Sequence, residues 1–238
     1  VVIGAGICGL AAADRLARAG RSVVVLDKEA LGWGASSRNG GMVIPELKAG
    51  PATLEAKYGT VGRLLYDEVN EAFYHVEAVI AGDDGRGGIA CDYERTGQLY
   101  LAHSARHAPE LRTMAVEHGE VLVESIRFVP RDQLAAEIGS DAFFGGVVIE
   151  RPGGLHPAKF HAGMAGRAIE SGAQLFDRTA ATWHSWEDFG SRPGHLVTTT
   201  RGQIRAGDVI LATNAYADAA TPGLQARVLP VGSYIIAT

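Results

Sequence analysis

The 238-residue sequence has few residues of several kinds, and each shortage excludes a class of protein. Two cysteines are too few for a disulfide framework, which favours a reducing compartment, and we expect the cytoplasm. Lysine and arginine total 22 against 27 acidic residues, so no basic excess favours nucleic acid as a partner. The apolar first segment meets Asp14 and Arg15 too early to cross a bilayer, and we expect no integral membrane segment.

Glycine, in contrast, is abundant, and its spacing near the start of the sequence is informative. The segment VVIGAGICGL places Gly4, Gly6 and Gly9 in the pattern G-x-G-x-x-G directly after a short apolar run. In dinucleotide-binding folds the first such glycine permits a tight turn, the second lets the backbone approach a pyrophosphate, and the third allows close helix packing. The negative phosphates then lie at a helix N-terminus.

The surrounding sequence supports this interpretation over that of an ordinary βαβ unit. Residues 7–19 show helical periodicity and are followed by Gly20, a residue typical of helix ends. The segment SVVVLD predicts a second strand that ends at Asp27. That position is close to the offset of about 20 residues at which a carboxylate accepts a hydrogen bond from a ribose hydroxyl.

The segment GWGASSRNGG, residues 32–41, favours FAD over a nicotinamide cofactor. A backbone with few side chains can follow a large flat ligand, while Ser36, Ser37 and Asn39 offer hydrogen bonds to phosphate or ring atoms. A nicotinamide domain usually continues from the acidic residue into another helix and strand. A flexible surface loop is the alternative for this segment, and a nicotinamide enzyme is a weaker alternative for the chain.

Five segments together carry a family resemblance that covers nearly the whole sequence. They are VVIGAGICGLAAADRLARAG, VVVLDKEALGWGASSRNGG, GGLHPAKFHAGMAGRAIESGAQLF, VILATNAYAD and RVLPVGSYIIAT. In this order they resemble the FAD-dependent oxidoreductases grouped with D-amino-acid oxidase, glycine oxidase and sarcosine oxidase, most closely the gamma-glutamylputrescine oxidase-like bacterial amine oxidases. The resemblance implies an α/β fold, α+β overall, in which a discontinuous Rossmann-like FAD-binding domain accompanies an antiparallel-sheet substrate domain.

The resemblance also implies which residues bind FAD, with the glycine turn at the pyrophosphate and Asp27 at the adenosine ribose. Lys28 lies beside the adenosine or is simply solvated, and Arg38 either pairs with a phosphate or stabilises the reduced flavin. The cofactor-binding set is Gly4, Ala5, Gly6, Gly9, Asp27, Lys28, Ser36, Ser37, Arg38, Asn39, Gly40, Ala181, Ala212, Thr213 and Asn214.

The implied reaction is oxidation of an amine or amino acid at its C–N bond by hydride transfer to flavin N5, followed by hydrolysis of the imine. Oxygen or another electron acceptor completes the cycle, so oxidase and dehydrogenase both remain open. Alternatives are oxidation of a hydroxy acid or glycerol phosphate on the same fold, and a non-catalytic FAD-binding fragment. The cofactor supplies this chemistry, and the sequence indicates no catalytic base. It indicates neither the particular amine nor the oligomeric state.

One departure from the family concerns attachment of the flavin. Several relatives bind it covalently through a histidine in or near the glycine-rich loop, whereas no histidine occurs between Asp27 and Gly50. We therefore expect no histidyl link, while a cysteinyl link from a C-terminal part remains open. The sequence begins inside an expected strand without methionine and ends in another, so we expect truncation at both ends.

The expected domain plan is discontinuous. Residues 1–82 and 150–220 form the FAD-binding domain, 83–149 form the substrate domain, and 221–238 begin its second part. Helical spacing predicts one long helix over 54–81, and alternation predicts an antiparallel hairpin over 89–102. Further expected elements are helices near 109–117, 131–138 and 157–171, and strands at 143–150, 195–200, 203–213 and 227–238.

The histidines and tyrosines outside these motifs carry weaker signals. His103 and His107 lack carboxylate or cysteine partners at metal-ligand spacing, so we expect no metal site. His156 either lines the substrate pocket or caps the following helix. Aromatic residues near strand ends can line a pocket or simply pack in the core. The tyrosines in such positions are Tyr100, Tyr216 and Tyr234.

Overall fold

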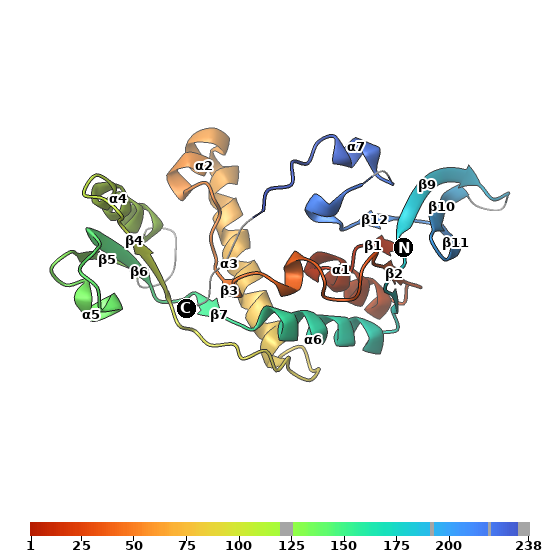
Figure 1. Ribbon diagram of the computed structural model, residues 1–238, viewed down its shortest axis with the longest axis horizontal. Helices are drawn as coiled ribbons and strands as arrows, with labels where there is room; N and C mark the ends of the chain where they lie inside the picture. The colour runs from red at the N-terminus through yellow and green to blue at the C-terminus, as the bar shows by residue number, and fades with distance from the viewer. Residues whose placement is uncertain (120–125, 191–192, 219, 233–238) are drawn as a thin grey trace. The chain divides into compact units, whose positions relative to one another are not determined.

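The computed structural model describes residues 1–119, 126–190, 193–218 and 220–232 (Figure 1). The chain forms two compact units, each assembled from separated segments. The first unit consists of Val1–Gly40, Ile89–Cys91 and His156–Thr238, and the second of Gly41–Gly88 and Asp92–Leu155.

The first unit is built on a parallel sheet of four short strands in the order β12-β1-β2-β8. The strands are β1 (Val2–Ile3), β2 (Val24–Leu26), β8 (Gln174–Phe176) and β12 (Ile210–Leu211). Val2, Val25 and Leu26 are almost completely buried. Apolar runs of this kind are typical of parallel strands that are covered on both faces.

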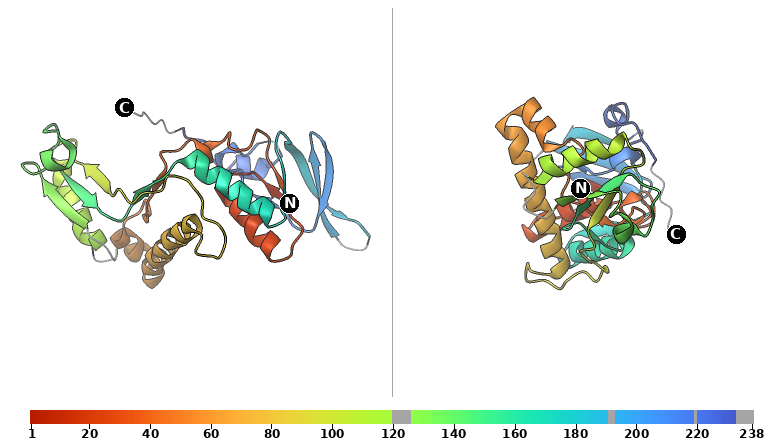
Figure 2. Two further views of the ribbon diagram at one scale, coloured as in Figure 1. Left: turned by 90° about the horizontal axis from the view of Figure 1, so that it is seen from below. Right: turned by 90° about the vertical axis from the view of Figure 1, so that its left-hand side faces the viewer.

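Two helices of the first unit pack against each other, α1 (Ile7–Arg18) and α6 (Pro157–Glu170) (Figure 2). Leu10 and Ala13 lie on the buried face of α1, and Phe160 and Met164 on that of α6. α1 ends before Gly20, whose φ of 76° is the left-handed conformation that terminates helices. Pro157 occupies the first turn of α6, where its missing N–H costs no hydrogen bond.

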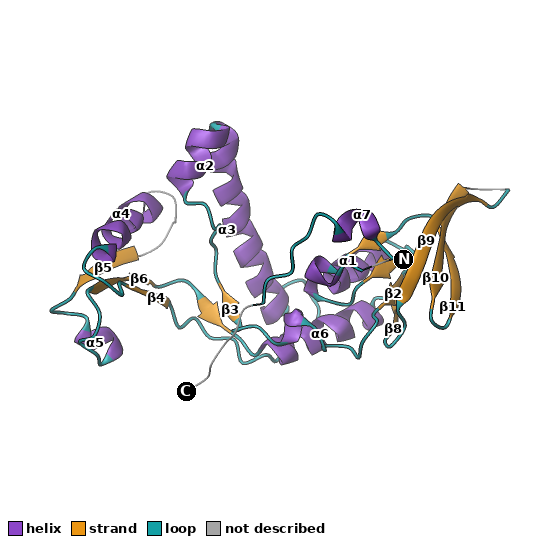
Figure 3. Cartoon of the chain, turned by 45° about the horizontal axis from the view of Figure 1, so that its top comes forward, coloured by secondary structure: helices purple, strands orange, loops and turns teal. Residues whose placement is uncertain are grey.

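A separate antiparallel sheet in the first unit contains three strands in the order β11-β10-β9 (Figure 3). The strands are β9 (Ala181–Asp188), β10 (Pro193–Thr199) and β11 (Gly202–Ala206). The expected single strand over 203–213 is therefore wrong: β11 pairs with β10, whereas β12 joins the parallel sheet. The unit also contains the short helices η1 (Ala35–Ser37), η2 (Asn214–Tyr216) and α7 (Pro222–Gln225).

The second unit contains a three-stranded antiparallel sheet in the order β4-β6-β5, with α4 packed against it. Its core includes Leu111 and Ala115 from the helix and Val147 and Ile149 from the central strand. These elements are β4 (Gln98–Leu101), α4 (His107–Gly119), β5 (Ile126–Pro130), α5 (Ala135–Ile138) and β6 (Gly145–Ile149). A second antiparallel pair joins β3 (Met42–Val43) to β7 (Gly153–Gly154).

The expectation of one long helix over 54–81 is wrong, because the chain forms two helices, α2 (Pro51–Tyr58) and α3 (Thr60–Ala81). Gly59 separates them with a φ of 59° and a ψ of −139°, a conformation that side-chain-bearing residues rarely adopt. The helices also approach closely, since a Cβ on Gly62 would lie 2.1 Å from the carbonyl oxygen of Leu54.

The expected hairpin over 89–102 is also wrong. Only β4 forms in this segment, and its partner is β6, about fifty residues further along the chain. The preceding stretch makes a single bridge between Glu94 and Gly154, and Gly97 donates its N–H to the Pro152 carbonyl oxygen. The helix expected near 131–138 is limited to the single turn of α5, whereas the strand near 143–150 and the helix near 109–117 form as β6 and α4.

The compact units differ from the expected domains at several boundaries: residues 89–91 and the described residues after 220 group with the first unit, and residues 150–155 with the second. Residues 41–82, including α2 and α3, group with the antiparallel sheet of the second unit. The domain plan assigned them to the FAD-binding domain, and it stays a prediction about function. The strand expected over 227–238 falls largely outside the described residues, as does Tyr234.

Candidate functional site

Three glycines shape the turn between β1 and α1, each for a different physical reason. Gly4 has a φ of 105°, and a Cβ there would lie 2.6 Å from the carbonyl oxygen of Ala212. A Cβ on Gly9 would lie 2.0 Å from the carbonyl oxygen of Gly4, so a side chain would separate α1 from the turn. A Cβ on Gly6 would meet only the Ser36 hydroxyl, at 2.9 Å. Gly4 and Gly9 are thus required by the packing of the backbone, whereas Gly6 leaves the turn open to close approach by a ligand.

Asp27 lies directly after β2 and links the end of that strand to the glycine turn. Its Oδ2 accepts a hydrogen bond from the Ala5 N–H at 2.9 Å, and its Oδ1 accepts one from the Glu29 N–H at 3.0 Å. A carboxylate oxygen can accept more than one hydrogen bond, so Asp27 retains capacity for a ligand hydroxyl. The predicted acidic residue therefore stands next to the predicted phosphate turn.

Ser36 supplies a hydrogen-bond acceptor to the first turn of α1. The helix begins after Gly6, which has no side chain to cap it, and the Ser36 Oγ accepts the Ile7 N–H at 3.2 Å. No acidic residue occupies this first turn, so the positive end of the helix dipole has no carboxylate within the helix beside it. This end of α1 has the features that favour a bound anion.

The segment 32–41 forms a turn with internal hydrogen bonds around η1. The hydroxyl of Ser37 donates to the Gly32 carbonyl oxygen and lies 3.3 Å from that of Gly34. The Asn39 side-chain amide donates to the carbonyl oxygens of Ala35 and Ser36, both at 3.1 Å. Two of the predicted polar ligands are thus engaged inside the loop, whereas Ser36 reaches the helix. Gly40 is exposed at its end.

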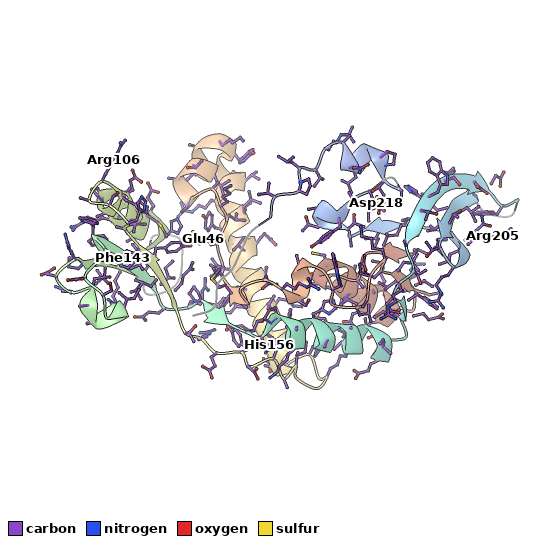
Figure 4. All side chains as sticks on the ribbon, viewed as in Figure 1. Glu46, Arg106, Phe143, His156, Arg205 and Asp218 are labelled. Carbon is purple, nitrogen blue, oxygen red and sulfur yellow. The ribbon has the colours of Figure 1, made fainter. Side chains whose placement is uncertain are left out.

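Aromatic and cationic side chains form a chain of contacts beside this loop. The Arg38 guanidinium lies 5.0 Å from the Trp33 ring centre, and Trp33 meets Tyr216 edge-on at 6.0 Å. Lys28 lies 5.9 Å from the centre of the Tyr216 ring, and its ammonium group is 3.8 Å from the Asp218 carboxylate (Figure 4). Tyr216 therefore packs against Trp33 and Lys28 in this structure.

The remaining predicted residues lie around the ends of β12 and β9. The Ala212 N–H donates to the Ile3 carbonyl oxygen at 2.8 Å, which places the end of β12 against the glycine turn. The Thr213 hydroxyl is buried and has no partner among the described residues. Asn214 has a φ of 47° and begins η2. Ala181 begins β9 and packs on the apolar cluster that contains Leu26.

Sequence reasoning missed one side chain at the turn, His161 on α6. It is 4% exposed, and its Nε2 lies 2.7 Å from the carbonyl oxygen of Ala5. The available signal was its place on the apolar face of the helix, between Phe160 and Met164. A polar residue on such a face needs a hydrogen-bonding partner.

The histidines singled out in the sequence have no metal-binding geometry in the described part of the chain. The rings of His103 and His107 lie 4.7 Å apart, but the described residues contain no group of three or more potential metal ligands. His156 caps α6, with its Nδ1 3.5 Å from the Lys159 N–H (Figure 4). Among the described helices none combines the length and the apolar character needed to cross a membrane.

A second group of titratable residues lies in the other unit, around the segment between β3 and α2. The Tyr100 hydroxyl donates to Glu46, and the Tyr66 hydroxyl donates to the Ala49 carbonyl oxygen at 3.0 Å. Burial and the charge of Glu46 raise the pKa of Tyr66 to about 12. Burial lowers the pKa of His118, whose Nε2 would lie 3.6 Å from a Cβ on Gly50. Tyr100 is therefore held by a hydrogen bond and by the core of its own sheet.

The sequences of known proteins can be aligned with the whole length of this chain. Probable oxidoreductase OrdL of Haemophilus influenzae is 31% identical over 243 residues, and gamma-glutamylputrescine oxidoreductase of Escherichia coli is 29% identical over 239 residues. Each match covers 100% of this chain and 54% of the relative, so the chain spans about half the length of both. The crystal structure of glycine oxidase from Geobacillus kaustophilus matches with a TM-score of 0.72 at 21% identity, covering 94% of this chain and 57% of that one.

The family model described as FAD dependent oxidoreductase matches residues 1–238, the entire sequence. This match agrees with the resemblance carried by the five segments and with the parallel sheet, glycine turn and acidic residue described above. The chain belongs to the FAD-dependent oxidoreductase family that includes the amine and amino-acid oxidases.

Proposed function

We propose that the first unit binds FAD at the glycine turn, with the pyrophosphate at the N-terminus of α1 and the adenosine ribose at Asp27. The observation that carries this proposal is the arrangement of Ala5, Gly6 and Asp27. The Ala5 N–H donates to the Asp27 carboxylate and holds it in place. Gly6 has no side chain that would cover the adjacent backbone. The aspartate side chain, although one methylene shorter than that of glutamate, already reaches the turn in this structure.

The described residues fit the cofactor in two further ways. The Ser36 hydroxyl lies against the first turn of α1, where a phosphate oxygen could accept the same N–H group. The unpartnered, buried hydroxyl of Thr213 lies at the end of β12, beside Gly4. A buried hydroxyl without a partner is costly, and a ligand atom would satisfy it.

The other predicted contacts follow from placing the pyrophosphate at the N-terminus of α1 and the ribose at Asp27. Lys28 stands next to Asp27 and would accompany the adenosine, and the backbone of Ala181 would meet adenine. Ala212, Thr213 and Asn214 would close over the nucleotide. Ser37, Arg38, Asn39 and Gly40 would line the phosphates and the isoalloxazine. In this arrangement Arg38 either pairs with a phosphate or stabilises the negative charge of the reduced flavin.

We propose further that the complete protein oxidises an amine or amino acid. Held by these residues, FAD would supply a hydride acceptor, its N5, for the carbon that bears the substrate nitrogen. The nitrogen would release a proton, and water would hydrolyse the product imine to a carbonyl compound. Oxygen or another electron acceptor would take the two electrons onward. The names of two similar proteins support a C–N substrate, gamma-glutamylputrescine oxidoreductase and glycine oxidase. We assign no catalytic base, and we place the protein in the cytoplasm.

The cofactor proposal is tested by the visible absorption spectrum of the purified protein after incubation with FAD. We expect the two absorption bands of bound oxidised flavin and quenching of its fluorescence. A protein that neither retains nor binds flavin would contradict the site at Asp27 and Gly6.

The reaction is tested by adding substrates to the flavin-loaded protein, expressed from its complete gene, without oxygen. The amines are gamma-glutamylputrescine, glycine and sarcosine, and the alcohols are glycerol 3-phosphate and a 2-hydroxy acid. Bleaching of the flavin band by an amine supports C–N oxidation. Bleaching by an alcohol alone replaces it with C–OH oxidation, and bleaching by none favours a non-catalytic role.

A further inference from the structure

The buried imidazole of His161 lies against the backbone of the glycine turn. His161 comes from α6, is 4% exposed, and places its Nε2 2.7 Å from the carbonyl oxygen of Ala5. A carbonyl oxygen only accepts hydrogen bonds, so Nε2 carries the hydrogen and donates it. The contact joins residues 156 positions apart in the sequence.

Both polar backbone groups of Ala5 are consequently held by side chains. Asp27 accepts its N–H at 2.9 Å, and His161 donates to its carbonyl oxygen. The peptide that follows Ala5 is planar and trans, so its C=O and its N–H point in opposite directions. Fixing the oxygen toward α6 therefore directs the Gly6 N–H away from that helix. No acceptor among the described residues takes this N–H.

The same imidazole also lies beside Gly32, in the glycine-rich loop of the proposed FAD site. A Cβ on Gly32 would lie 3.4 Å from the His161 Nδ1 and 3.7 Å from its Cε1. Gly32 has a φ of 78°, and its carbonyl oxygen accepts the Ser37 hydroxyl. α6 packs against both α1 and η1, which brings the histidine between the glycine turn and the loop.

We propose that His161 is a positioning residue for FAD. It holds the Ala5–Gly6 peptide so that the Gly6 N–H faces the pyrophosphate, and it sets the distance between the glycine turn and Gly32. This inference rests on the proposed FAD site. It assigns a phosphate-orienting role to a residue that makes no contact with the phosphate itself.

A histidine that merely fills the core would respond differently to substitution. His161→Gln carries a side-chain N–H near the position of Nε2, whereas His161→Leu removes the donor and leaves the Ala5 carbonyl oxygen buried without it. His161→Asn remains polar but is too short to reach that oxygen. Phe160→Leu, on the same buried face of α6, is a matched control for lost packing.

The test measures the FAD dissociation constant by fluorescence quenching, and the unfolding of each apoprotein by chemical denaturation. We expect wild type and His161→Gln to bind FAD within about threefold of each other. His161→Leu and His161→Asn should bind about 10- to 100-fold more weakly, the effect of one lost buried hydrogen bond. Phe160→Leu should lower the unfolding free energy of the apoprotein but leave the dissociation constant nearly unchanged.

Two results overturn the inference while leaving the FAD site intact. One is wild-type affinity in both His161→Leu and His161→Asn. The other is a loss of affinity in His161→Gln equal to that in His161→Leu, because the side-chain donor would then not be what matters. If His161→Leu fails to fold, the comparison of His161→Asn with His161→Gln decides alone. Failure of the wild-type protein to bind FAD would instead contradict the proposed function.

Discussion

Asp27 in the first unit and Glu77 in the second are both held by several hydrogen bonds, but the donors differ in kind. Asp27 accepts from two backbone N–H groups, those of Ala5 and Glu29. Glu77 accepts from the guanidinium of Arg95 at 2.7 Å and 2.6 Å, and from the Tyr93 hydroxyl. The hydrogen bonds from Arg95 lower the pKa of Glu77 against the opposing effect of burial.

We infer that this difference separates the proposed ligand site at Asp27 from an ion pair at Glu77 that only stabilises the fold. Backbone donors position the Asp27 carboxylate while its charge stays available to hydroxyl groups of a ligand. Charged and phenolic side chains occupy the Glu77 oxygens and join α3 to the segment around Arg95. We infer that the first unit presents its polar backbone at the glycine turn, whereas polar side chains cross-link the second.

The largest effects are expected at the glycine turn, where neighbouring substitutions should separate folding from binding. In Gly9→Val the new Cβ would lie 2.0 Å from a backbone oxygen, so we expect loss of the folded protein. In Gly6→Val the Cβ meets only the Ser36 hydroxyl, and its backbone φ of −73° suits any residue. That variant should fold and lose FAD affinity by about 100-fold or more, because the side chain fills the phosphate approach.

Circular dichroism and flavin binding distinguish these outcomes. Ala11→Val, at an exposed position of α1, is a control that adds the same side chain away from the turn. Normal flavin content in folded Gly6→Val would refute the placement of the pyrophosphate.

The next largest effect is expected from the second unit, where two arginines contact the same aromatic ring. Arg151 and Arg95 lie 5.0 Å and 5.8 Å from the centre of Phe73. Arg151 is 2% exposed and donates to Asn70 and to the Tyr74 hydroxyl, whereas the Arg95 side chain is 48% exposed. Arg151→Met should lower the unfolding free energy by about 1–3 kcal/mol, since it leaves the buried Asn70 side-chain oxygen without its donor.

Arg95→Met is the matched control, and it should cost less than about 1 kcal/mol because its ion pair is partly exposed to solvent. Urea denaturation measures both values. Equal losses in the two variants would show that burial of Arg151 adds nothing to the stability of the second unit.

The sequence predicted the glycine turn and its acidic residue because the signal is local. The pattern of strand, turn, helix and strand fixes the fold around Gly4 and Gly9, and Asp27 follows β2 directly. Pro157 and His156 equally allowed the start of α6 to be predicted. These features depend on residues that lie within a few positions of one another.

Features that depend on contacts between residues distant in the sequence could not be predicted from it. A glycine within a helical pattern is usually tolerated, so Gly59 gave no sign of the break between α2 and α3. β4 pairs with β6 because of the tertiary fold, and the nearer segment around Cys91 offered an equally plausible partner. Arg151 and His161 are polar residues whose burial follows from partners 81 and 156 positions away.

Smaller effects on FAD affinity and on stability are expected from Asp27→Asn and Glu77→Gln, which test the two carboxylates separately. Asp27→Asn keeps one acceptor for the Ala5 N–H but loses the charge that strengthens a hydrogen bond from ribose. We expect FAD affinity to fall about 10- to 100-fold with little change in unfolding of the apoprotein.

Glu77→Gln should show the opposite, a lower unfolding free energy with FAD affinity preserved. Isothermal titration with FAD and denaturation of both variants provide the test. The distinction drawn between the two carboxylates would be lost if Glu77→Gln weakened FAD binding, or if Asp27→Asn bound FAD as tightly as wild type.

The smallest effect is expected from pH, through His118 in the second unit. This histidine is 4% exposed, its Nδ1 has no partner among the described residues, and its ring meets Tyr66 edge-on. Burial lowers its pKa in the folded protein, against the opposing charges of Glu46 and Glu117. Below its ordinary value of 6.5 the unfolded chain therefore binds more protons than the folded one, so acidification favours unfolding.

Stability should accordingly be unaffected by His118 above about pH 7 and should decline as the pH falls from 6.5, until the folded-state pKa is passed. The slope for one proton does not exceed about 1.4 kcal/mol per pH unit. Urea denaturation between about pH 7.5 and 5 in wild type and His118→Gln isolates this contribution, because the other histidines are common to both. The variant should lose less stability than wild type over this range. Parallel curves would show that His118 titrates alike in the folded and unfolded chains, and the second unit would then owe none of its acid sensitivity to this buried imidazole.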